Sequence, residues 1–459
     1  MKNSILKVVT LTLVFITHLY AVAYPNDYDF EWDGLVYNVL SNKDRTVEVT
    51  CIHSESPDNN IYVSGDIEVP EKVPYNSNTY TVISIGMGAF NCCDNLISVT
   101  IPNTVTSIGV DAFCGCSSLQ SVNIPNSVTS IGEYAFSSCK SLTTVTIPKS
   151  VAFINRKAFT FCDNLTAINV DSDNDVFSSI DGVLYNKNAS SLKCCPGGKT
   201  SVTIPNSVTS IGAYAFYSCK KLSSVTIPNS VITIGEGAFG YCYSLTAIAL
   251  PTSVTSIGSG IFTDCESLTA VTIPNSVTSI GYRAFSYCKS LTTVTIPNSV
   301  TSIGQDAFSH CSGLTSVTIP NSVISIGRGA FYNCSKLGAI YMQRDVPIEC
   351  TPSFSENVTA EAILYVPTGT LRAYKNTNPW RKFWNIVEMD FSGVDEVAED
   401  RGDAIRVENG RIVTEGDALT EVLDLQGRTV YRGYDRVVDN LARGLYVVRS
   451  GNNTVKIKL

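Results

Sequence analysis

The chain has 459 residues, of which 44% are apolar and only 16% are charged. This length exceeds what one hydrophobic core organises, so it predicts several units or a repeat array. The formal net charge of -8 and the pI near 5.1 argue against a nucleic-acid partner, which would select a basic face.

Residues 1–23 have the features of a secretory signal peptide. Lys2 and Lys7 precede an apolar run at 8–19, and small residues at 21–23 form a cleavage pattern. The apolar run is shorter than a bilayer crossing requires, so a signal peptide is favoured over a membrane anchor. The sequence therefore predicts export, with no transmembrane segment in the mature chain.

Residues 24–80 precede the regular part of the sequence. Apolar and polar residues alternate over 30–39 and 46–50, a pattern that predicts a hairpin or short sheet. The end of a repeat array needs a structured cover, so we interpret this region as an N-terminal β cap.

A 23-residue phrase repeats within residues 81–340. Its pivot phenylalanine recurs every 23 residues except for one step of 57, at Phe90, Phe113, Phe136, Phe159, Phe216, Phe239, Phe262, Phe285, Phe308 and Phe331. A fixed period of this length with regular Leu and Ile is typical of a leucine-rich-repeat solenoid. The long step contains an insertion at about 171–199, where Asp181-Gly182 between apolar alternations predicts a protruding hairpin.

Each repeat is expected to form one coil of the solenoid. Helical spacing around the pivot predicts a short helical turn, and the following alternation predicts a short parallel strand that a proline ends. The predicted core positions in two representative coils are Phe136, Cys139, Leu142, Val145, Ile147, Phe216, Cys219 and Leu222. A single coil cannot bury these side chains alone, so the coils must stack.

Three regions follow the repeats. Residues 341–389 contain a predicted strand at 364–367 and the aromatic residues Trp380, Phe383 and Trp384, and we interpret them as a C-terminal cap. Residues 390–404 are acidic and are expected to be a linker. Residues 405–459 contain short alternating runs divided by glycines, which predict a small β-sandwich domain.

Sixteen cysteines raise the question of disulfides. Ten of them occupy the same position of the coil, and identical positions in stacked coils point in parallel, which is poor disulfide geometry. A core ladder of buried thiols is therefore favoured. The pairing stays open for the cysteines outside this ladder, which are Cys51, Cys92, Cys114, Cys194, Cys195 and Cys350.

Two short motifs are weighed against simpler explanations. Residues 171–175 read Asp-x-Asp-x-Asp, but Val176 stands where a calcium loop needs glycine, so a solvated acidic turn is favoured. Arg401-Gly402-Asp403 is an integrin-type tripeptide in the predicted linker, where a chance occurrence is favoured over use. The nucleophile, zinc-protease and phosphate-loop motifs are absent, so no enzyme, metal or cofactor is expected.

Two surfaces are candidates for recognition. The first is the outward strand face, a hydroxyl array that includes Thr144, Thr146, Thr203, Thr226, Thr295 and Thr318. The second is the variable set around the pivot, with Tyr214, Tyr217, Tyr241, Tyr243, Tyr282, Tyr287, His310 and Tyr332. Tyrosine is a frequent anchor at protein interfaces, whereas a hydroxyl array suits a polymer such as a glycan. Interruptions of the threonine column at Asn123, Asn169, Ala249 and Tyr341 disfavour binding to a regular lattice.

The repeated phrase Ile-Gly-x-x-Ala-Phe-x-x-Cys-x-x-Leu-x-x-Val-x-Ile-Pro-x-Ser-Val closely resembles the BspA-like subtype of leucine-rich repeats. In this phrase Ser150 stands where the common leucine-rich repeat has Asn or Cys. The resemblance implies a secreted or cell-surface bacterial adhesin that recognises host matrix or plasma proteins, such as fibronectin and fibrinogen, or other bacterial cells. A polymer- or glycan-binding solenoid using the Ser/Thr strand face, or a scaffold without a specific ligand, remains the alternative.

Two segments of the tail carry a second resemblance. Residues 424–428, Asp-Leu-Gln-Gly-Arg, and 441–449, Leu-Ala-Arg-Gly-Leu-Tyr-Val-Val-Arg, resemble the type IX secretion sorting domain of Bacteroidetes. This resemblance implies that the secretion machinery recognises the C-terminal domain. The chain would then be released from the cell or held on its outer surface.

Overall fold

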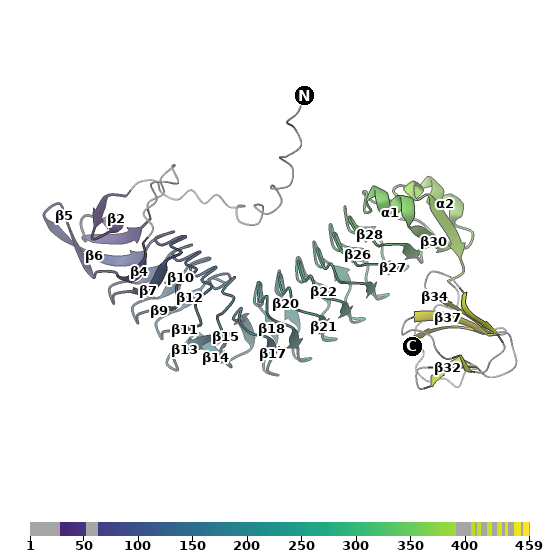
Figure 1. Ribbon diagram of the computed structural model, residues 1–459, viewed down its shortest axis with the longest axis horizontal. Coiled ribbons are helices and arrows are strands. Elements are labelled where there is room, and N and C mark those ends of the chain that lie inside the picture. The colour runs from purple at the N-terminus through teal and green to yellow at the C-terminus, as the bar shows by residue number, and fades with distance from the viewer. Residues whose placement is uncertain are drawn as a thin grey trace, which may run out of the picture. The chain divides into compact units, whose positions relative to one another are not determined.

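The computed structural model describes residues 28–51 and 63–391, and the strands between 405 and 458 (Figure 1). The chain divides into two compact units, Met1–Leu245 and Thr246–Leu459. The predicted leader at 1–23 and the Arg-Gly-Asp tripeptide at 401–403 lie outside the described residues.

The N-terminal unit begins with a small sheet that leads into the first coil. Its strands are β1 (Phe30–Trp32), β2 (Leu35–Ser41), β3 (Thr46–Thr50), β5 (Lys72–Tyr75) and β6 (Asn78–Ile85). β1, β2 and β3 pair antiparallel, whereas β3 and β6 pair parallel. β6 therefore offers a parallel edge on which the first coil stacks.

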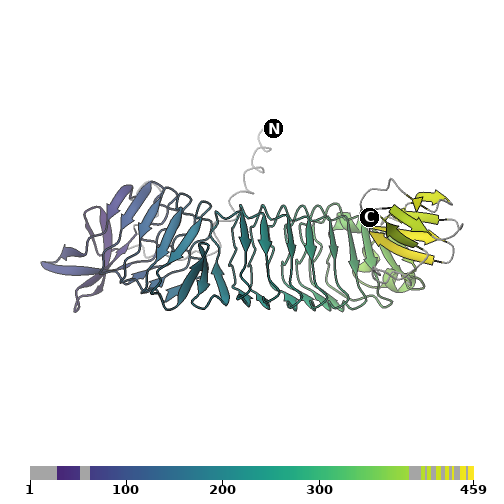
Figure 2. The ribbon, with the colours of Figure 1, turned by 90° about the horizontal axis from the view of Figure 1, so that it is seen from below.

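Each coil contributes two short strands, which pair in parallel with the strands of neighbouring coils (Figure 2). The first set contains β4 (Gly65–Glu68), β7 (Leu96–Thr100), β9 (Ser121–Asn123), β11 (Thr144–Ile147), β13 (Ala167–Val170), β17 (Ser201–Thr203) and β19 (Ser224–Thr226). The second set contains β8 (Ser107–Ile108), β10 (Ser130–Ile131), β12 (Phe153–Ile154), β18 (Ser210–Ile211) and β20 (Thr233–Ile234). The sequence predicts only the first set, because a two-residue strand is too short to show an alternation.

The segment around the pivot forms separate tight turns rather than a continuous helix. The N–H of Leu142 donates to the Cys139 carbonyl at 3.2 Å, as in one helical turn. The N–H of Phe136, in contrast, donates to the Ala158 carbonyl of the next coil at 2.8 Å. Backbone hydrogen bonds within a coil thus alternate with hydrogen bonds to the next coil. The predicted helical turn is therefore present only as isolated turns.

Stacked pivot rings run through the core of each unit. In the N-terminal unit, Phe113 lies 5.1 Å from Phe90 and 5.2 Å from Phe136 between ring centroids, with nearly parallel planes. In the C-terminal unit the column runs from Phe262 to Phe354. The predicted core residues Phe136, Cys139, Leu142, Val145, Ile147, Phe216, Cys219 and Leu222 are all buried.

The cysteine ladder consists of buried thiols that also donate hydrogen bonds. Cys139 Sγ donates to the Phe113 carbonyl at 3.2 Å, and six other coils repeat this bond at 3.0–3.2 Å. All 16 cysteines lie in the described residues and are free thiols. Burial raises the pKa of Cys162 to about 12, which keeps this thiol protonated and unreactive.

A row of serine hydroxyls forms a second ladder at the corner of the coil. Ser150 Oγ donates to the Val128 carbonyl of the preceding coil at 2.6 Å, and the equivalent serines of five other coils do the same. These bonds satisfy corner carbonyls that would otherwise lack a partner in the ladder. Serine therefore serves where the common leucine-rich repeat uses asparagine.

The insertion contains β14 (Phe177–Ile180), β15 (Val183–Asn186) and β16 (Ser191–Cys194). β14 and β15 form the predicted hairpin, and Asp181 and Gly182 both have positive φ, as a type I′ turn requires. The predicted protrusion is wrong, because the hairpin lies against β13. The N–H of Ile168 donates to the Gly182 carbonyl at 2.8 Å, so the hairpin covers the edge of β13.

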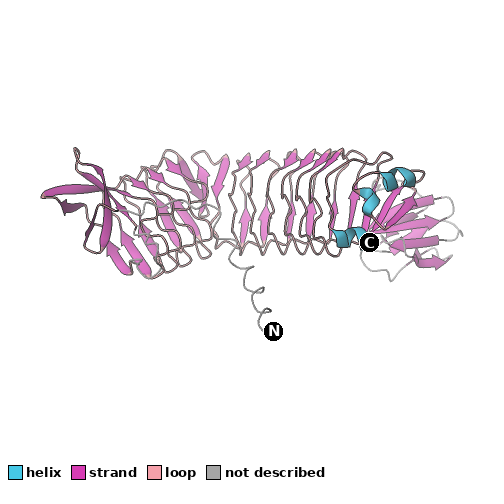
Figure 3. Ribbon diagram, turned by 90° about the horizontal axis from the view of Figure 1, so that it is seen from above, coloured by secondary structure: helices cyan, strands magenta, loops and turns pink. Residues whose placement is uncertain are grey.

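The C-terminal unit continues the same coil pattern. One set of strands contains β21 (Ala247–Ala249), β23 (Ala270–Thr272), β25 (Thr293–Thr295), β27 (Ser316–Ile319), β29 (Ala339–Met342), β30 (Ile363–Pro367) and β31 (Asn385–Met389). The other contains β22 (Ser256–Ile257), β24 (Ser279–Ile280), β26 (Ser302–Ile303) and β28 (Ser325–Ile326). The helix α1 (Glu356–Glu361) lies between β29 and β30 in the chain, and the helix α2 (Leu371–Asn376) and the 3₁₀ turn η2 (Trp380–Lys382) lie between β30 and β31 (Figure 3).

Aromatic residues after the last coil cover the end of the pivot column. Phe354 stacks on Phe331, and the rings of Trp380 and Phe383 lie 5.8 and 5.3 Å from Phe354. The indole N–H of Trp380 donates to the Ile348 carbonyl at 2.7 Å, which satisfies its buried polar atom. Trp384, by contrast, is 82% exposed.

Two antiparallel sheets form the C-terminal β region. One contains β32 (Ile405–Glu408), β33 (Arg411–Thr414) and β36 (Val437–Val438), and the other contains β34 (Thr420–Asp424), β35 (Thr429–Gly433), β37 (Leu445–Ser450) and β38 (Asn453–Lys458). Ile412, Val422, Val438, Tyr446 and Val448 form one buried cluster. Both sheets contribute to this cluster, as expected of the predicted sandwich.

Candidate binding surfaces

The predicted hydroxyl array lies on the first set of strands of the N-terminal unit and on β25 and β27 of the C-terminal unit, and it is not uniform. Thr144, Thr146, Thr203, Thr226 and Thr295 are exposed, whereas Thr318 is half-buried. Ser316, which shares a strand with Thr318, is buried, and Ala249 replaces the hydroxyl in β21. In the N-terminal unit the threonine column is interrupted by Asn123 in β9 and Asn169 in β13, so neither unit presents an unbroken array.

Two positions of each coil, two residues before and two after the pivot, are usually in the left-handed backbone region. Around Phe216 these are Tyr214 and Ser218, with φ of 60° and 62°. Tyr241, Tyr287 and His310 occupy the second position of their coils, with φ of 60–62°. A residue other than glycine there costs about 1–3 kcal/mol, and such strain is found preferentially at functional sites.

Five rings of the N-terminal unit gather into what we term the first aromatic cluster, which consists of Phe161, Tyr214, Tyr217, Tyr241 and Tyr243. Tyr217 lies 5.0 Å from Tyr241, 5.5 Å from Tyr214 and 5.9 Å from Phe161 between ring centroids. These pairs meet edge to face, a favoured aromatic geometry. All five residues are half-buried, so part of each ring faces solvent.

A shortened coil at the end of the insertion creates this cluster. The N–H of Cys195 donates to the Ala215 carbonyl at 2.7 Å, which is the bond that the pivot phenylalanine makes in other coils. Cys195 thus takes the pivot position. With the outer turn of this coil missing, the N–H of Phe161 donates instead to Ser218 Oγ at 2.6 Å. Phe161 and Tyr217 consequently meet across the shortened coil.

Two lysine ammonium groups lie next to rings of the first aromatic cluster. Lys157 Nζ lies 4.6 Å from the Tyr214 ring centroid and 3.1 Å from the Tyr134 hydroxyl. Burial lowers the pKa of Lys157, but the hydrogen bond to Tyr134 and nearby negative groups outweigh this effect and raise the pKa overall. Lys220 Nζ lies 5.4 Å from the Phe161 centroid and 3.0 Å from an Asp163 carboxylate oxygen. The cluster therefore combines apolar faces with fixed positive charge.

The C-terminal unit carries the second aromatic cluster, which consists of Tyr287, His310 and Tyr332. Tyr287 and His310 stack with ring centroids 4.2 Å apart, and Tyr332 meets His310 at 5.8 Å. His310 Nε2 lies 3.1 Å from Asn333 Nδ2, and burial lowers the pKa of His310. Tyr287 and Tyr332 are 38% and 46% exposed, which leaves them accessible to a partner.

Seven of the eight variable residues predicted from the sequence lie in the two clusters. The eighth, Tyr282, instead has its ring 5.0 Å from the Arg283 guanidinium. Sequence reasoning missed Phe161 and Lys157, which contact Tyr217 and Tyr214, and Lys220, which lies next to the Phe161 ring. A signal for Phe161 exists, because it stands two residues after its pivot, the position that Tyr241 occupies in its own coil. No comparable signal exists for the lysines.

The acidic stretch at 171–175 is organised by an asparagine and a lysine. Asn174 is buried, and its Nδ2 donates to the Pro148 and Val151 carbonyls at 2.8 and 3.0 Å. Lys187 Nζ donates to the Ser172 and Asn174 carbonyls. Within the described residues, no group of three or more His, Cys, Asp or Glu side chains is placed to hold a metal ion.

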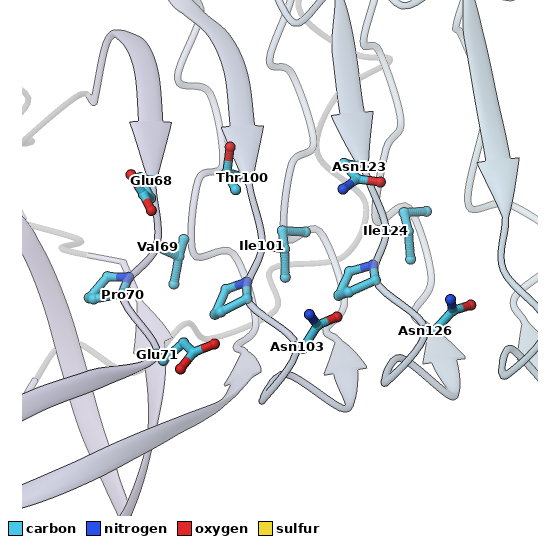
Figure 4. Close-up of a pocket in the computed structure, with 12 residues that line it drawn as sticks. Glu68, Val69, Pro70, Glu71, Thr100, Ile101, Asn103, Asn123, Ile124 and Asn126 are labelled. Atoms are coloured by element: carbon cyan, nitrogen blue, oxygen red, sulfur yellow. The ribbon is translucent and has the colours of Figure 1, made fainter.

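A shallow pocket of about 480 Å³ lies where β4, β7 and β9 end (Figure 4). Each of these three coils contributes a polar residue, an apolar residue, a proline and a second polar residue in sequence. The lining residues are Glu68, Val69, Pro70 and Glu71, Thr100, Ile101, Pro102 and Asn103, and Asn123, Ile124, Pro125 and Asn126. The pocket is therefore one repeated corner, seen in three successive coils.

No helix among the described residues has the length and apolar character that a bilayer crossing requires. No curated protein matches the chain. One similar solved structure is that of a leucine-rich repeat protein from Bacteroides ovatus. It is 28% identical, the alignment covers 76% of this chain and 81% of that chain, and the TM-score is 0.44.

Two further solved structures are similar to the chain. A leucine rich cell surface protein from Faecalibacterium prausnitzii is 26% identical, with 68% of this chain and 94% of that chain covered and a TM-score of 0.42. The pneumococcal vaccine antigen PcpA is 18% identical, with 80% and 99% covered and a TM-score of 0.49.

The repeated phrase matches a known protein family over most of the coils. The match is to the BspA type leucine rich repeat region, in copies over residues 83–196, 188–314 and 256–364. These segments overlap and together cover more than half of the chain, including the shortened coil and the start of the C-terminal cap. The chain therefore belongs to the BspA-type leucine-rich repeat family.

Proposed function

We propose that the protein is a secreted or cell-surface solenoid that binds other proteins through its two aromatic clusters. The observation that carries this proposal is the gathering of half-exposed and exposed rings on the outer turns of the coils. Tyrosine offers a large, rigid and amphipathic contact area at low cost in conformational entropy. Such rings dominate the binding energy of many protein interfaces.

The fold itself does not require these rings. At the position of Tyr241 and Tyr287, other coils carry Ser138, Gly115 or Asn333, and the same left-handed turn forms there. Glycine or asparagine fits this conformation with less strain than tyrosine. The rings therefore add strain without improving the turn, which supports a role in contact with a partner.

The expected partners are host matrix or plasma proteins of the fibronectin or fibrinogen kind, or the surfaces of other bacterial cells. This expectation comes from the family resemblance and not from the geometry of the clusters. The predicted signal peptide and the resemblance of residues 405–459 to a type IX sorting domain support export to the outer surface. We propose no enzymatic activity.

The alternative, glycan binding through the Ser/Thr strand face, has less support as the main function. Its hydroxyl array is interrupted at Ala249 and buried at Ser316. A long polymer bound along the whole face would meet these interruptions. The aromatic clusters, in contrast, each form a continuous surface within one unit.

The test uses the purified mature chain and immobilised fibronectin, fibrinogen and whole bacterial cells, with binding measured by surface plasmon resonance or cell retention. Tyr217→Ser/Tyr241→Ser and Tyr287→Ser/Tyr332→Ser remove the two clusters separately, and Thr293→Ser/Thr295→Ser is the matched surface control. We expect at least one tyrosine pair to raise Kd more than tenfold, because an anchor residue contributes about 2 kcal/mol or more. Saturable binding that both tyrosine pairs leave unchanged contradicts the proposal, provided the melting temperatures are equal.

A further inference from the structure

The pocket at the ends of β4, β7 and β9 has the form of a short groove with two polar rims (Figure 4). Between the rims, Pro70 and Pro102 are half-buried, whereas Pro125 is buried. One rim is formed by Glu68, Thr100 and Asn123, at the ends of the strands. The opposite rim is formed by Glu71, Asn103 and Asn126, at the following corner. In each coil a proline lies between the two rims, and the side chains of all six rim residues are exposed.

The amide rim is not a requirement of the turn. The corner closes by a bond from the Val105 N–H to the Pro102 carbonyl at 3.1 Å, with Asn103 between them. The same bond forms in the coil of Lys149, where the Val151 N–H donates to the Pro148 carbonyl at 3.2 Å. Lysine therefore replaces asparagine here without any change in the corner. Exposed amides at Asn103 and Asn126 are thus available for another use.

We propose that this groove binds an extended, neutral oligosaccharide. A pyranose ring has apolar C–H faces and hydroxyl groups around its edge, so it matches the half-buried prolines Pro70 and Pro102 between two polar rims. Each asparagine amide offers donors and an acceptor, which suits a hydroxyl group that both donates and accepts. The site is separate from both aromatic clusters, and its function does not depend on the proposed protein binding.

The spacing of the coils sets the shape of the ligand. Equivalent residues in neighbouring parallel strands are about 4.8 Å apart, so the prolines between the rims repeat at this distance from Pro70 to Pro125. A straight chain of sugar rings has a repeat of similar length, whereas a helical chain does not remain in register. The hairpin of β14 and β15 covers the edge of β13 and so interrupts the row of strands. A short, extended oligosaccharide therefore fits better than a long or curved polymer.

The charge of the groove adds a second criterion. Glu68 and Glu71 lie on opposite rims of the first coil, on either side of Pro70 (Figure 4). Two carboxylates at one end disfavour a ligand with carboxylate or sulfate groups, because the like charges repel. The ligand is therefore expected to be neutral rather than a uronic-acid or sialylated chain.

The experiment titrates the purified mature chain with cellotetraose and chitotetraose as extended neutral probes. Maltotetraose is the curved control, and tetragalacturonate is the acidic one, with binding measured by calorimetry. Asn103→Ala/Asn126→Ala removes two amides of the rim, while the control Asn357→Ala/Asn376→Ala removes two exposed amides on α1 and α2, away from any strand corner. Circular dichroism melting checks that both variants remain folded, as expected for exposed side chains.

We expect saturable binding of at least one extended probe and a Kd at least tenfold higher for Asn103→Ala/Asn126→Ala. The Asn357→Ala/Asn376→Ala control should retain the original affinity. Three results would each overturn the proposal. The first is a lack of saturation by either extended probe up to about 10 mM, a range in which even very weak binding is detected. The second is an equal loss of affinity in both variants. The third is tighter binding of tetragalacturonate than of the extended probes.

Discussion

Replacement of Phe136 by alanine tests whether stacked pivot rings hold the coils together. The ring is fully buried, and it lies 5.2 Å from Phe113 and 5.5 Å from Phe159. A buried Phe→Ala change costs about 3–5 kcal/mol of unfolding free energy. Phe216 is equally buried but stacks on one pivot ring only, Phe239, because Cys195 takes the pivot position on its other side.

The difference between the two variants isolates the contribution of ring stacking. An aromatic pair adds about 0.5–1.5 kcal/mol beyond the burial of its area. We therefore expect Phe136→Ala to cost more than Phe216→Ala by about this amount. Phe216→Ala should itself lie within the usual range for a buried phenylalanine.

Unfolding in guanidinium, followed by circular dichroism, measures the overall loss of stability in each variant. Hydrogen exchange with mass spectrometry then locates it, because coils of a repeat array can open locally. Phe153→Ala, at a position that is 57% exposed, is the control and should change stability by less than about 0.5 kcal/mol. A Phe136→Ala variant as stable as the control would refute the core assignment. A Phe216→Ala variant that loses as much as Phe136→Ala would refute the stacking argument.

Two further predictions concern packing and pH. Gly132→Ala should cost about 1–3 kcal/mol, since its new Cβ would lie 2.6 Å from the Gly109 carbonyl carbon, whereas Gly338→Ala, with no atom closer than 4.0 Å, should be almost neutral in thermal melts. The pKa of Cys162 and Cys334 is raised to about 12 by burial, above the ordinary thiol value near 8.5. The folded thiols keep protons that the unfolded chain loses, so this stability is complete below about pH 8.5 and declines from there to about pH 12. The free energy of unfolding, measured by denaturant titration, should fall between pH 8 and 10, by about 2 kcal/mol for each such thiol at pH 10. A free energy that does not change over this range would contradict the burial of the ladder.

The regular parts of the fold follow from the sequence because their signals are local and repeated. The 23-residue period gives the coils, the Val145–Ile147 alternation gives β11, and Asp181-Gly182 gives the hairpin. The paired two-residue strands carry no such signal. The helical spacing around Phe136 was misleading, because apolar residues recur at that spacing in any compact turn that faces a core.

The first aromatic cluster could be predicted only in part, for a physical reason. The contact of Phe161 with Tyr217 joins two coils whose pivots are 57 residues apart in the sequence. Whether they meet depends on how the insertion rejoins the stack, and Cys195 gives no sign in the sequence that it replaces a phenylalanine. Contacts that depend on an irregular connection are invisible to a periodicity argument.

The corner groove and the first aromatic cluster differ in the kind of ligand that each can recognise. An ordinary coil presents nearly the same corner as its neighbours, so a row such as Asn103 and Asn126 offers equal contacts at equal spacing. Such a row suits a ligand that is itself repetitive. The shortened coil breaks this equality, and the rings around Phe161 consequently form an arrangement that no regular coil of the N-terminal unit reproduces. A folded protein surface has no repeat and needs a unique counterpart, so the irregular site is the better candidate for a protein and the regular groove for a glycan.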